Sequence, residues 1–281
     1  MKCPQCDSEI ARHLTACSEC GCQLGFPNVR QAERAEEKLA LSGRYDVACA
    51  GLQARGCDPI RMEFEQTVRL KSRPVICRRW GTIASITERL DQLFRTYYEI
   101  VDAGERQPQD NGFDIARQAV DATFFPYFFK SLNFAALSLS RRGPHSYGDC
   151  HFTFSERAIS HRTTVFEENT LVFCAKHKVV VGQAPPNGYL STWEERARLA
   201  VCKLGSQLTI ATTLAEFAEI LVVQTGKTDT DEFLECHIFG RLSIPNVESF
   251  WAAKPKSKED KVLAARAKRK LRDAGVTVED P

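Results

Sequence analysis

The chain has 281 residues, of which 43% are hydrophobic and 26% charged, with a net charge of +2. This composition is that of an ordinary globular protein with its own core, and the near-neutral charge excludes a uniformly basic nucleic-acid-binding protein. No apolar run approaches the roughly 20 residues that cross a bilayer, and the N-terminus lacks the apolar stretch of a signal peptide. The sequence therefore predicts a cytoplasmic protein with no membrane partner.

Cysteines crowd the first two dozen residues, where "CPQC" and "CSEC" form two C-x-x-C pairs. In a reducing compartment this spacing indicates a metal site, because each pair places two thiolates at one side of a tetrahedron. It predicts a structural Zn²⁺ on Cys3, Cys6, Cys17 and Cys20. Cys22 and His13 are alternative ligands. The segment resembles a zinc ribbon over residues 1–26, and four thiolates leave no open position for catalysis.

Residues 27–111 are expected to form a helical region. Asn28 is placed to cap a first helix that ends near Gly43, and the following residues are expected to fold back as a helical hairpin. A longer helix is expected from Ser85, which forms a capping-box pattern with Glu88. Residues 102–112 are polar and rich in helix breakers, which indicates a loop or a domain boundary.

Residues 112–252 mix helices and strands, which predicts an α+β domain rather than a doubly wound sheet. A helix is expected at "FDIARQAVDATFF", and strands at "YGDCHFTFSE", "HRTTVFEEN" and "DEFLECHIFG". Another helix is expected in "STWEERARLAVCKLG", with Ser191 and Glu194 as its capping box and Gly205 at its end.

The strand at "DEFLECHIFG" has two chemically different faces. Leu234, Cys236 and Ile238 point to one side, whereas Glu235 and His237 point to the other, because successive strand side chains alternate. Phe233 and Phe239 flank the polar pair on its own face. This pattern predicts either a polar cleft wall framed by aromatic rings or the solvated face of an edge strand.

Three segments in this order, "LSLSRRG…SYGDCHFTFSE", "HRTTVFEENT" and "FLECHIFGRLSI", resemble the mono-ADP-ribosyltransferase fold of the bacterial toxin and phage-associated branch. The resemblance covers roughly residues 134–248. It implies an ADP-ribosyltransferase-like split β-sandwich with helices, and a reaction in which ADP-ribose passes from NAD⁺ to a macromolecular acceptor.

The resemblance also implies roles for particular side chains. Glu235 would stabilise the ribosyl cation, as paired carboxylates do in glycosidases, and Arg162 would hold the phosphates of NAD⁺. Thr163 and Thr164 would brace the glutamate or the ribose. Tyr147 would stack on the nicotinamide. Rival candidates for the phosphate role are Arg141 and Arg142.

The chain departs from the family where many members carry Glu or Gln two residues from the catalytic glutamate, because His237 stands in that region. This departure argues against an arginine acceptor, and the imidazole is a candidate base for another acceptor. The sequence favours nucleic acid, RNA first, over protein, and the toxin resemblance adds an inhibitory antitoxin protein as a partner. The competing interpretation is a non-enzymatic zinc-ribbon module that binds nucleic acid or protein.

The last segment, residues 253–281, is strongly basic from Lys254 to Arg272 and has a helical pattern over its later part. Such a run is either a solvated helix on the surface or an arm that binds nucleic acid or an acidic partner.

Overall fold

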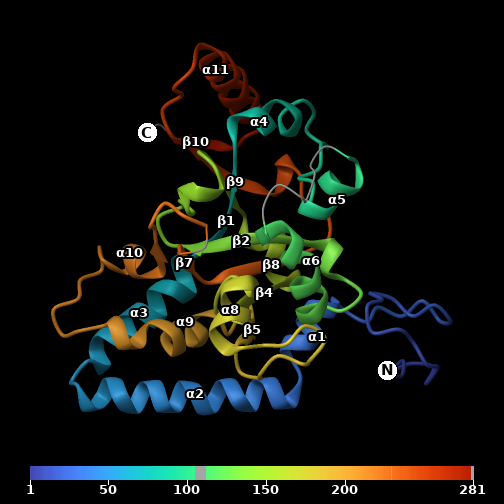
Figure 1. Ribbon diagram of the computed structural model, residues 1–281, viewed down its shortest axis with the longest axis vertical. Helices are drawn as coiled ribbons and strands as arrows, with labels where there is room; N and C mark the ends of the chain where they lie inside the picture. Colours follow the sequence, from blue (N-terminus) through green and yellow to red (C-terminus); the bar gives the residue numbers. More distant parts are fainter. Residues whose placement is uncertain (105–111, 229, 280–281) are drawn as a thin grey trace.

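The computed structural model of the chain describes residues 1–104, 112–228 and 230–279 (Figure 1). The N-terminal cysteine segment lies at one side of the molecule, and a long helix lies along its lower end. The helices are α1 Pro27–Ala32, α2 Ala35–Ala54, α3 Asp58–Lys71, α4 Trp80–Ile86, α5 Tyr97–Asp102, α6 Gly112–Phe124, α7 Glu156–Ile159, α8 Thr170–His177, α9 Arg196–Leu204, α10 Phe217–Leu221 and α11 Lys258–Asp273.

The described strands form an eight-stranded sheet with the order β10-β9-β3-β1-β2-β8-β4-β5, and a two-stranded sheet of β6 and β7. The pairs in the large sheet are antiparallel, except that β10 runs parallel to β9. The strands are β1 Arg73–Arg78, β2 Leu132–Ser138, β3 Cys150–Phe154, β4 Thr163–Phe166, β5 Leu190–Thr192, β6 Val222–Val223, β7 Glu232–Phe233, β8 Glu235–Phe239, β9 Val247–Ala252 and β10 Thr277–Glu279.

The α+β class predicted from the sequence is confirmed, as are the strands expected around residues 150, 164 and 236. These strands lie in one continuously hydrogen-bonded sheet. The more specific ADP-ribosyltransferase arrangement stays a prediction.

Strand β1 lies in the middle of the large sheet, between β2 and β3, although residues 27–111 are expected to be helical. Its centre, "PVIC", is a short apolar run that is buried throughout. Runs of this kind are typical of strands buried on both faces. The sheet therefore draws on both the region before and the region after the loop expected over residues 102–112, most of which lies outside the described residues.

The prediction of a long helix that begins at Ser85 is wrong. Helix α4 ends at Ile86, and the chain then turns until α5. Phe94 donates its backbone N–H to the Leu242 carbonyl at 2.8 Å, and its ring packs on Phe152 and Phe154. These tertiary contacts outweigh the local helical pattern, which is a weak preference by comparison.

The first helices also end elsewhere than expected. Gly43 lies inside α2, and the residues after it continue the same helix instead of forming a hairpin partner. Asn28 is no cap, because it lies within α1, and its side chain is fully buried against the sheet. Ser191 lies in β5, so the capping box expected with Glu194 does not form, whereas Gly205 does follow the last residue of α9.

Helices cover both faces of the sheet around β8 (Figure 1). Cys236 and Ile238 point into a large core shared with α2, α3 and α9. The opposite face, which carries Phe166 of β4, packs against α6 and α8 in a second, aromatic-rich core with Phe124 and Phe173. The face of β8 that bears Glu235 and His237 is therefore an interior face, and the alternative of a solvated edge is wrong.

Candidate functional site

The N-terminal segment folds as two matching cysteine knuckles. In the first, the backbone N–H of Cys3 donates to Ser8 and that of Asp7 to Cys3, and in the second, Cys17 and Gly21 make the equivalent bonds. Asp7 and Gly21 occupy corresponding positions with positive φ, 59° and 73°. The two C-x-x-C pairs are thus two copies of one local structure, which places four thiols face to face.

The sulfur geometry fits a four-coordinate metal ion. The ligand atoms of Cys3, Cys6, Cys17 and Cys20 all lie within 4.8 Å of one another. Cys3 and Cys20 are 3.6 Å apart and Cys6 and Cys17 are 3.7 Å apart. A tetrahedron with Zn–S bonds of about 2.3 Å needs sulfurs about 3.8 Å apart. These four cysteines would therefore hold Zn²⁺, which when bound joins the two knuckles.

The alternative ligands differ in position. Cys22 Sγ lies 3.2 Å from Cys3 Sγ, at the edge of the cluster, whereas the ring of His13 packs against Tyr127 at 6.0 Å between centroids. Cys22 is thus a fifth thiol beside the site, and His13 is engaged outside it.

Two side chains of α1 connect this ribbon to the sheet. Arg30 donates to the backbone carbonyls of Arg12, Leu14, Leu24 and Gly25 in the ribbon. Asn28, two residues earlier, donates through Nδ2 to the carbonyls of β8 and of the segment before β4, at 3.0 Å in both cases. The position of the ribbon is therefore fixed relative to the strand that carries Glu235.

Glu235 and His237 are adjacent on the interior face of β8 and contact each other. Glu235 is 3% exposed and His237 is fully buried. Glu235 Oε2 lies 3.1 Å from His237 Nε2, and Glu235 Oε1 accepts a hydrogen bond of 3.1 Å from Asn169 Nδ2. Asn169 caps the N-terminus of α8, where its Oδ1 accepts from Leu171. One carboxylate is thus held from two sides.

The imidazole of His237 is enclosed by aromatic rings. Phe125, Phe134 and Phe166 lie at centroid distances of 4.4, 5.2 and 6.0 Å. The expected framing by Phe233 and Phe239 is wrong, because Phe233 packs on Tyr147 and Phe239 packs on Phe26. Rings from neighbouring strands and from the end of α6 enclose the pair instead.

This enclosure defines what His237 does. An ionised carboxylate only accepts hydrogen bonds, so with Glu235 ionised the bond of 3.1 Å requires Nε2 of His237 as the donor. The other ring nitrogen, Nδ1, has no hydrogen-bond partner among the described residues. His237 is fully buried, and its contact with Glu235 helps to fix the position of the carboxylate.

Arg117, on α6, lies near this carboxylate, and sequence reasoning missed it. Its guanidinium lies over the rings of Tyr97 and Phe134 at 5.0 and 4.9 Å. Burial acts to lower its pKa, but the carboxylates of Asp121 and Glu235 raise the pKa of Arg117 overall. A forked cation is thus fixed over an aromatic surface, paired with Asp121 through Nε at 3.4 Å and within range of the charge of Glu235.

Arg78 and Tyr147 complete the surroundings. Arg78 donates to the backbone carbonyl of Cys77 at 3.0 Å, and burial together with the charge of Arg117 lowers the pKa of Arg78 to about 10. Tyr147 has its pKa raised by burial and by the charge of Glu235. Gly148 permits this approach, since a Cβ there would lie 2.3 Å from the Arg78 carbonyl carbon. Arg117 and Tyr147 are therefore both within range of the charge of Glu235, whereas Arg78 is within range of Arg117 and bonds backbone carbonyls at the end of β1.

Arg162 does not face Glu235. Its Nη1 donates to the carbonyls of Phe239 and Arg241 at 2.9 Å, and its Nε donates to that of Ala158 at 3.2 Å. It precedes Thr163, which pairs with Ile238, whereas Glu235 pairs with Phe166. The two residues therefore lie about four strand positions apart, on the order of 13 Å.

The other residues that were predicted to contact NAD⁺ do not all lie on the same side of the sheet as Glu235. Thr164 lies beside His237 and accepts a 3.4 Å bond from Asn28, whereas Thr163 donates to the Ile159 carbonyl at 2.7 Å. Arg141 pairs with Glu248 at 3.0 Å. Arg142 lies over Trp251 at 4.5 Å. Glu235, His237 and Thr164 are thus brought together with Tyr147, and the three candidate arginines are not.

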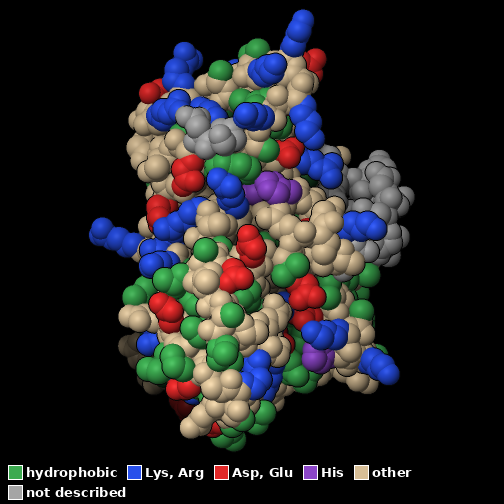
Figure 2. Space-filling view, turned by 90° about the vertical axis from the view of Figure 1, so that its left-hand side faces the viewer, with side chains coloured by type: hydrophobic (Ala, Val, Ile, Leu, Met, Phe, Trp, Pro, Cys, Tyr) green, Lys and Arg blue, Asp and Glu red, His purple; other side chains and the backbone are tan. Residues whose placement is uncertain are grey.

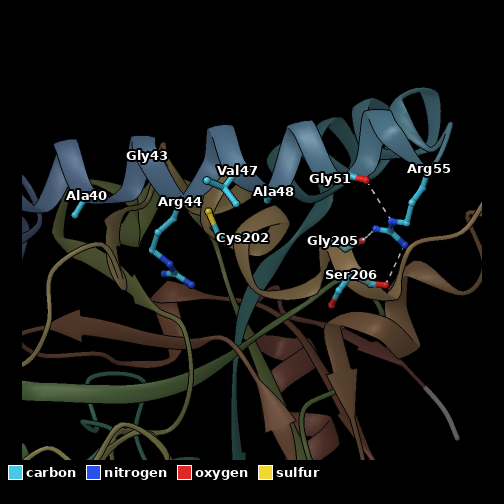
Figure 3. Close-up of a pocket in the computed structure, with 10 residues that line it drawn as sticks. All are labelled: Ala40, Gly43, Arg44, Val47, Ala48, Gly51, Arg55, Cys202, Gly205 and Ser206. Carbon is cyan, nitrogen blue, oxygen red and sulfur yellow. Dashed lines mark hydrogen bonds between the residues drawn. The ribbon is translucent and has the colours of Figure 1, made fainter.

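A hollow of about 720 Å³ lies elsewhere, between α2 and α9 (Figure 3). Its walls are mostly small or apolar, including Gly43, Val47 and Cys202. Arg55 at one end donates to backbone carbonyls, and Arg44 binds Glu167 and the Gly188 carbonyl. Both cations are engaged, so the hollow offers no unpaired charge to a ligand.

Comparison with protein-family models and with curated proteins finds no match for this sequence. Among the described residues, no helix combines the length and apolar character needed to span a bilayer.

Proposed function

We propose that the chain is a toxin-type, NAD⁺-dependent ADP-ribosyltransferase that modifies a macromolecule, nucleic acid in preference to protein. The observation that carries the proposal is the held carboxylate of Glu235, with Asn169 and His237 on its two oxygens and Arg117 and Tyr147 nearby. A fixed, poorly solvated carboxylate is suited to a positive charge that develops during a reaction.

In the proposed reaction, the bond between the nicotinamide nitrogen and the anomeric carbon of the ribose breaks, and nicotinamide leaves with the bonding electron pair. The sugar becomes cationic at that carbon, and the carboxylate of Glu235 stabilises the charge. A nucleophile of the acceptor then attacks the same carbon and loses its proton to solvent. His237 and Asn169 hold the carboxylate throughout.

The arginine that supports binding of NAD⁺ in this proposal is Arg117, in place of Arg162. Guanidiniums bind phosphate oxygens through two parallel donors, and Arg117 contacts Asp121 through Nε at 3.4 Å. Arg117 and Tyr147 are half-buried, whereas Glu235 is buried. A ligand that approaches the glutamate would therefore meet the cation and the phenol first.

The test uses NAD⁺ labelled in its adenylate part, incubated with the protein and with separate pools of RNA, DNA and cellular protein. We expect label in one pool, loss of labelling with Glu235→Gln, and no change with Glu36→Gln, an exposed carboxylate on α2. Equal labelling by Glu235→Gln, with its urea unfolding midpoint unchanged, would refute the assignment of Glu235.

A second candidate function is a non-enzymatic module in which the ribbon and the basic C-terminal segment bind nucleic acid or protein. Arg162 favours it, because the residue expected to hold the phosphates of NAD⁺ is occupied by three backbone carbonyls. Release of nicotinamide separates the two functions. A module would release none in the presence of any acceptor pool.

A further inference from the structure

The positive charge of the chain is concentrated in one segment. Lys254 to Arg272 contains nine lysines and arginines against two acidic residues, a net charge of +7. Since the whole chain carries +2, the rest of the chain carries −5. The near-neutral total therefore conceals a strongly basic segment on an acidic body.

This segment is a built part of the fold. Helix α11 covers most of it, and Ser257 caps the helix by accepting from the Asp260 backbone N–H at 2.9 Å. Ala264, Ala267 and Leu271 are buried in the main core, and the strand that follows the helix pairs with β9. Figure 1 shows α11 at the upper end of the molecule, beside α4. Its basic side chains are thus held on a rigid support.

The basic residues face away from that support. At 3.6 residues per turn, the buried stripe of α11 lies on one side, and a basic stripe lies on about the opposite side. The members of the basic stripe are Lys258, Lys261, Arg266, Arg269 and Arg272, all of them exposed. Lys254 and Lys256, just before the helix, are exposed as well. Lysine and arginine side chains gather over this upper end in Figure 2.

Stabilisation of the helix dipole explains only part of this pattern. Glu259 and Asp260 lie in the first turn, and Lys270 and Arg272 lie in the last turn, as the dipole favours. Lys254, Lys256 and Lys258, however, precede or begin the helix, where positive charge is unfavourable. Their placement adds to the basic surface at a cost to the helix.

We propose that this surface, α11 with Lys254 and Lys256, binds single-stranded nucleic acid through its phosphates. The face of α11 that is buried in the core leaves only its outer side available, which suits a flexible strand lying along the helix better than insertion into a duplex groove. The binding depends on charge alone. Its role in presenting an acceptor to Glu235 rests on the proposed function.

The experiment measures binding of a fluorescent 20-nucleotide RNA by anisotropy, without NAD⁺, from 50 to 300 mM KCl. A triple variant changes Lys261, Arg266 and Arg269 to Gln, and its matched control changes three other exposed cations, Arg34, Lys38 and Lys71, to Gln. We expect at least tenfold weaker binding by the triple variant and a salt slope smaller by about 2, because each phosphate contact to a single strand contributes about 0.7. The control variant is expected to bind as the parent does.

Three results would overturn the proposal: no RNA binding by the parent at 50 mM KCl, equal loss in the control variant, or tighter binding to duplex DNA than to RNA. Polyglutamate serves as a competitor, and displacement by polyglutamate equal to that by unlabelled RNA would identify an acidic protein surface as the partner instead. Since no NAD⁺ is present, a protein without transferase activity still gives a full answer. Transfer of label from NAD⁺ in the separate transferase assay, together with no RNA binding in this one, would support the proposed function and refute this role for α11.

Discussion

The position of Arg162 gives a direct test of two roles, because its hydrogen bonds are those of a structural residue, whereas the family resemblance makes it a phosphate ligand. We predict that Arg162→Lys destabilises the protein and leaves NAD⁺ binding intact. Lysine keeps the charge but has no forked guanidinium, so it can replace only part of the bonding to Phe239, Arg241 and Ala158.

The magnitude follows from those contacts. A hydrogen bond to a charged group contributes about 1.5–3 kcal/mol net, and water can replace the bond to the exposed Arg241 carbonyl. The loss is therefore about 2–3 kcal/mol in the free energy of unfolding. At about 2–4 °C per kcal/mol for a chain of this size, the melting temperature should fall by about 4–12 °C.

The assay compares urea and thermal unfolding of the parent, Arg162→Lys and Arg34→Lys, the last being an exposed control, and then measures NAD⁺ affinity by calorimetry. Arg117→Lys is expected to show the reverse pattern, with weakened NAD⁺ binding and a smaller loss of stability. The reasoning is refuted if Arg162→Lys unfolds at the parent's urea concentration and no longer binds NAD⁺.

Three further predictions concern the supporting structure. Gly148→Ala should cost about 3 kcal/mol or more in urea unfolding, since its φ is +143° and the new Cβ would lie 2.3 Å from the Arg78 carbonyl carbon; a loss below about 1 kcal/mol would contradict this. Burial lowers the pKa of His151 from 6.5 to about 4, so the unfolded chain binds more protons in this window and stability falls as the pH drops through it, by about 2.5 kcal/mol at pH 4.5 relative to pH 7.5. His151→Gln should remove that share of the pH dependence, and an unchanged difference between the two pH values would count against it. Metal analysis should find one zinc per chain, lost with Cys20→Ser and retained with Cys22→Ser; equal loss in both would make Cys22 a ligand.

The parts of the structure that the sequence predicted well are those specified by local pattern. The ribbon depends on cysteine spacing over a few residues, and the knuckles repeat the same backbone bonds. The strand of Glu235 depends on alternation, which correctly separated Cys236 and Ile238 from Glu235 and His237. In both cases the deciding residues are neighbours in the chain.

Local pattern was misleading where a distant segment decides the structure. Asn28 has the sequence signature of a helix cap, but its amide instead bonds the carbonyls of Arg162 and His237. Ser85 begins a capping-box pattern, but the chain there follows Phe94 into a core made by β3. A cap contributes about 1 kcal/mol, which the burial of one phenylalanine exceeds.

Arg117 and Arg78 could not be singled out from the sequence for a related reason. Arg117 lies in a helix whose periodicity shows only that it is amphipathic, and Arg78 ends a strand within the region that was expected to be helical. What distinguishes them is contact with other elements, because Arg78 donates to the Arg95 carbonyl, and Arg117 lies over the Phe134 ring and within range of the charge of Glu235. The Tyr-Gly pair did carry a signal, because Gly148 is required by a close approach to the end of β1, and Tyr147 beside it is within range of the charge of Glu235. A glycine that follows an aromatic residue just before a strand can therefore indicate the close approach of another backbone segment, as well as a turn.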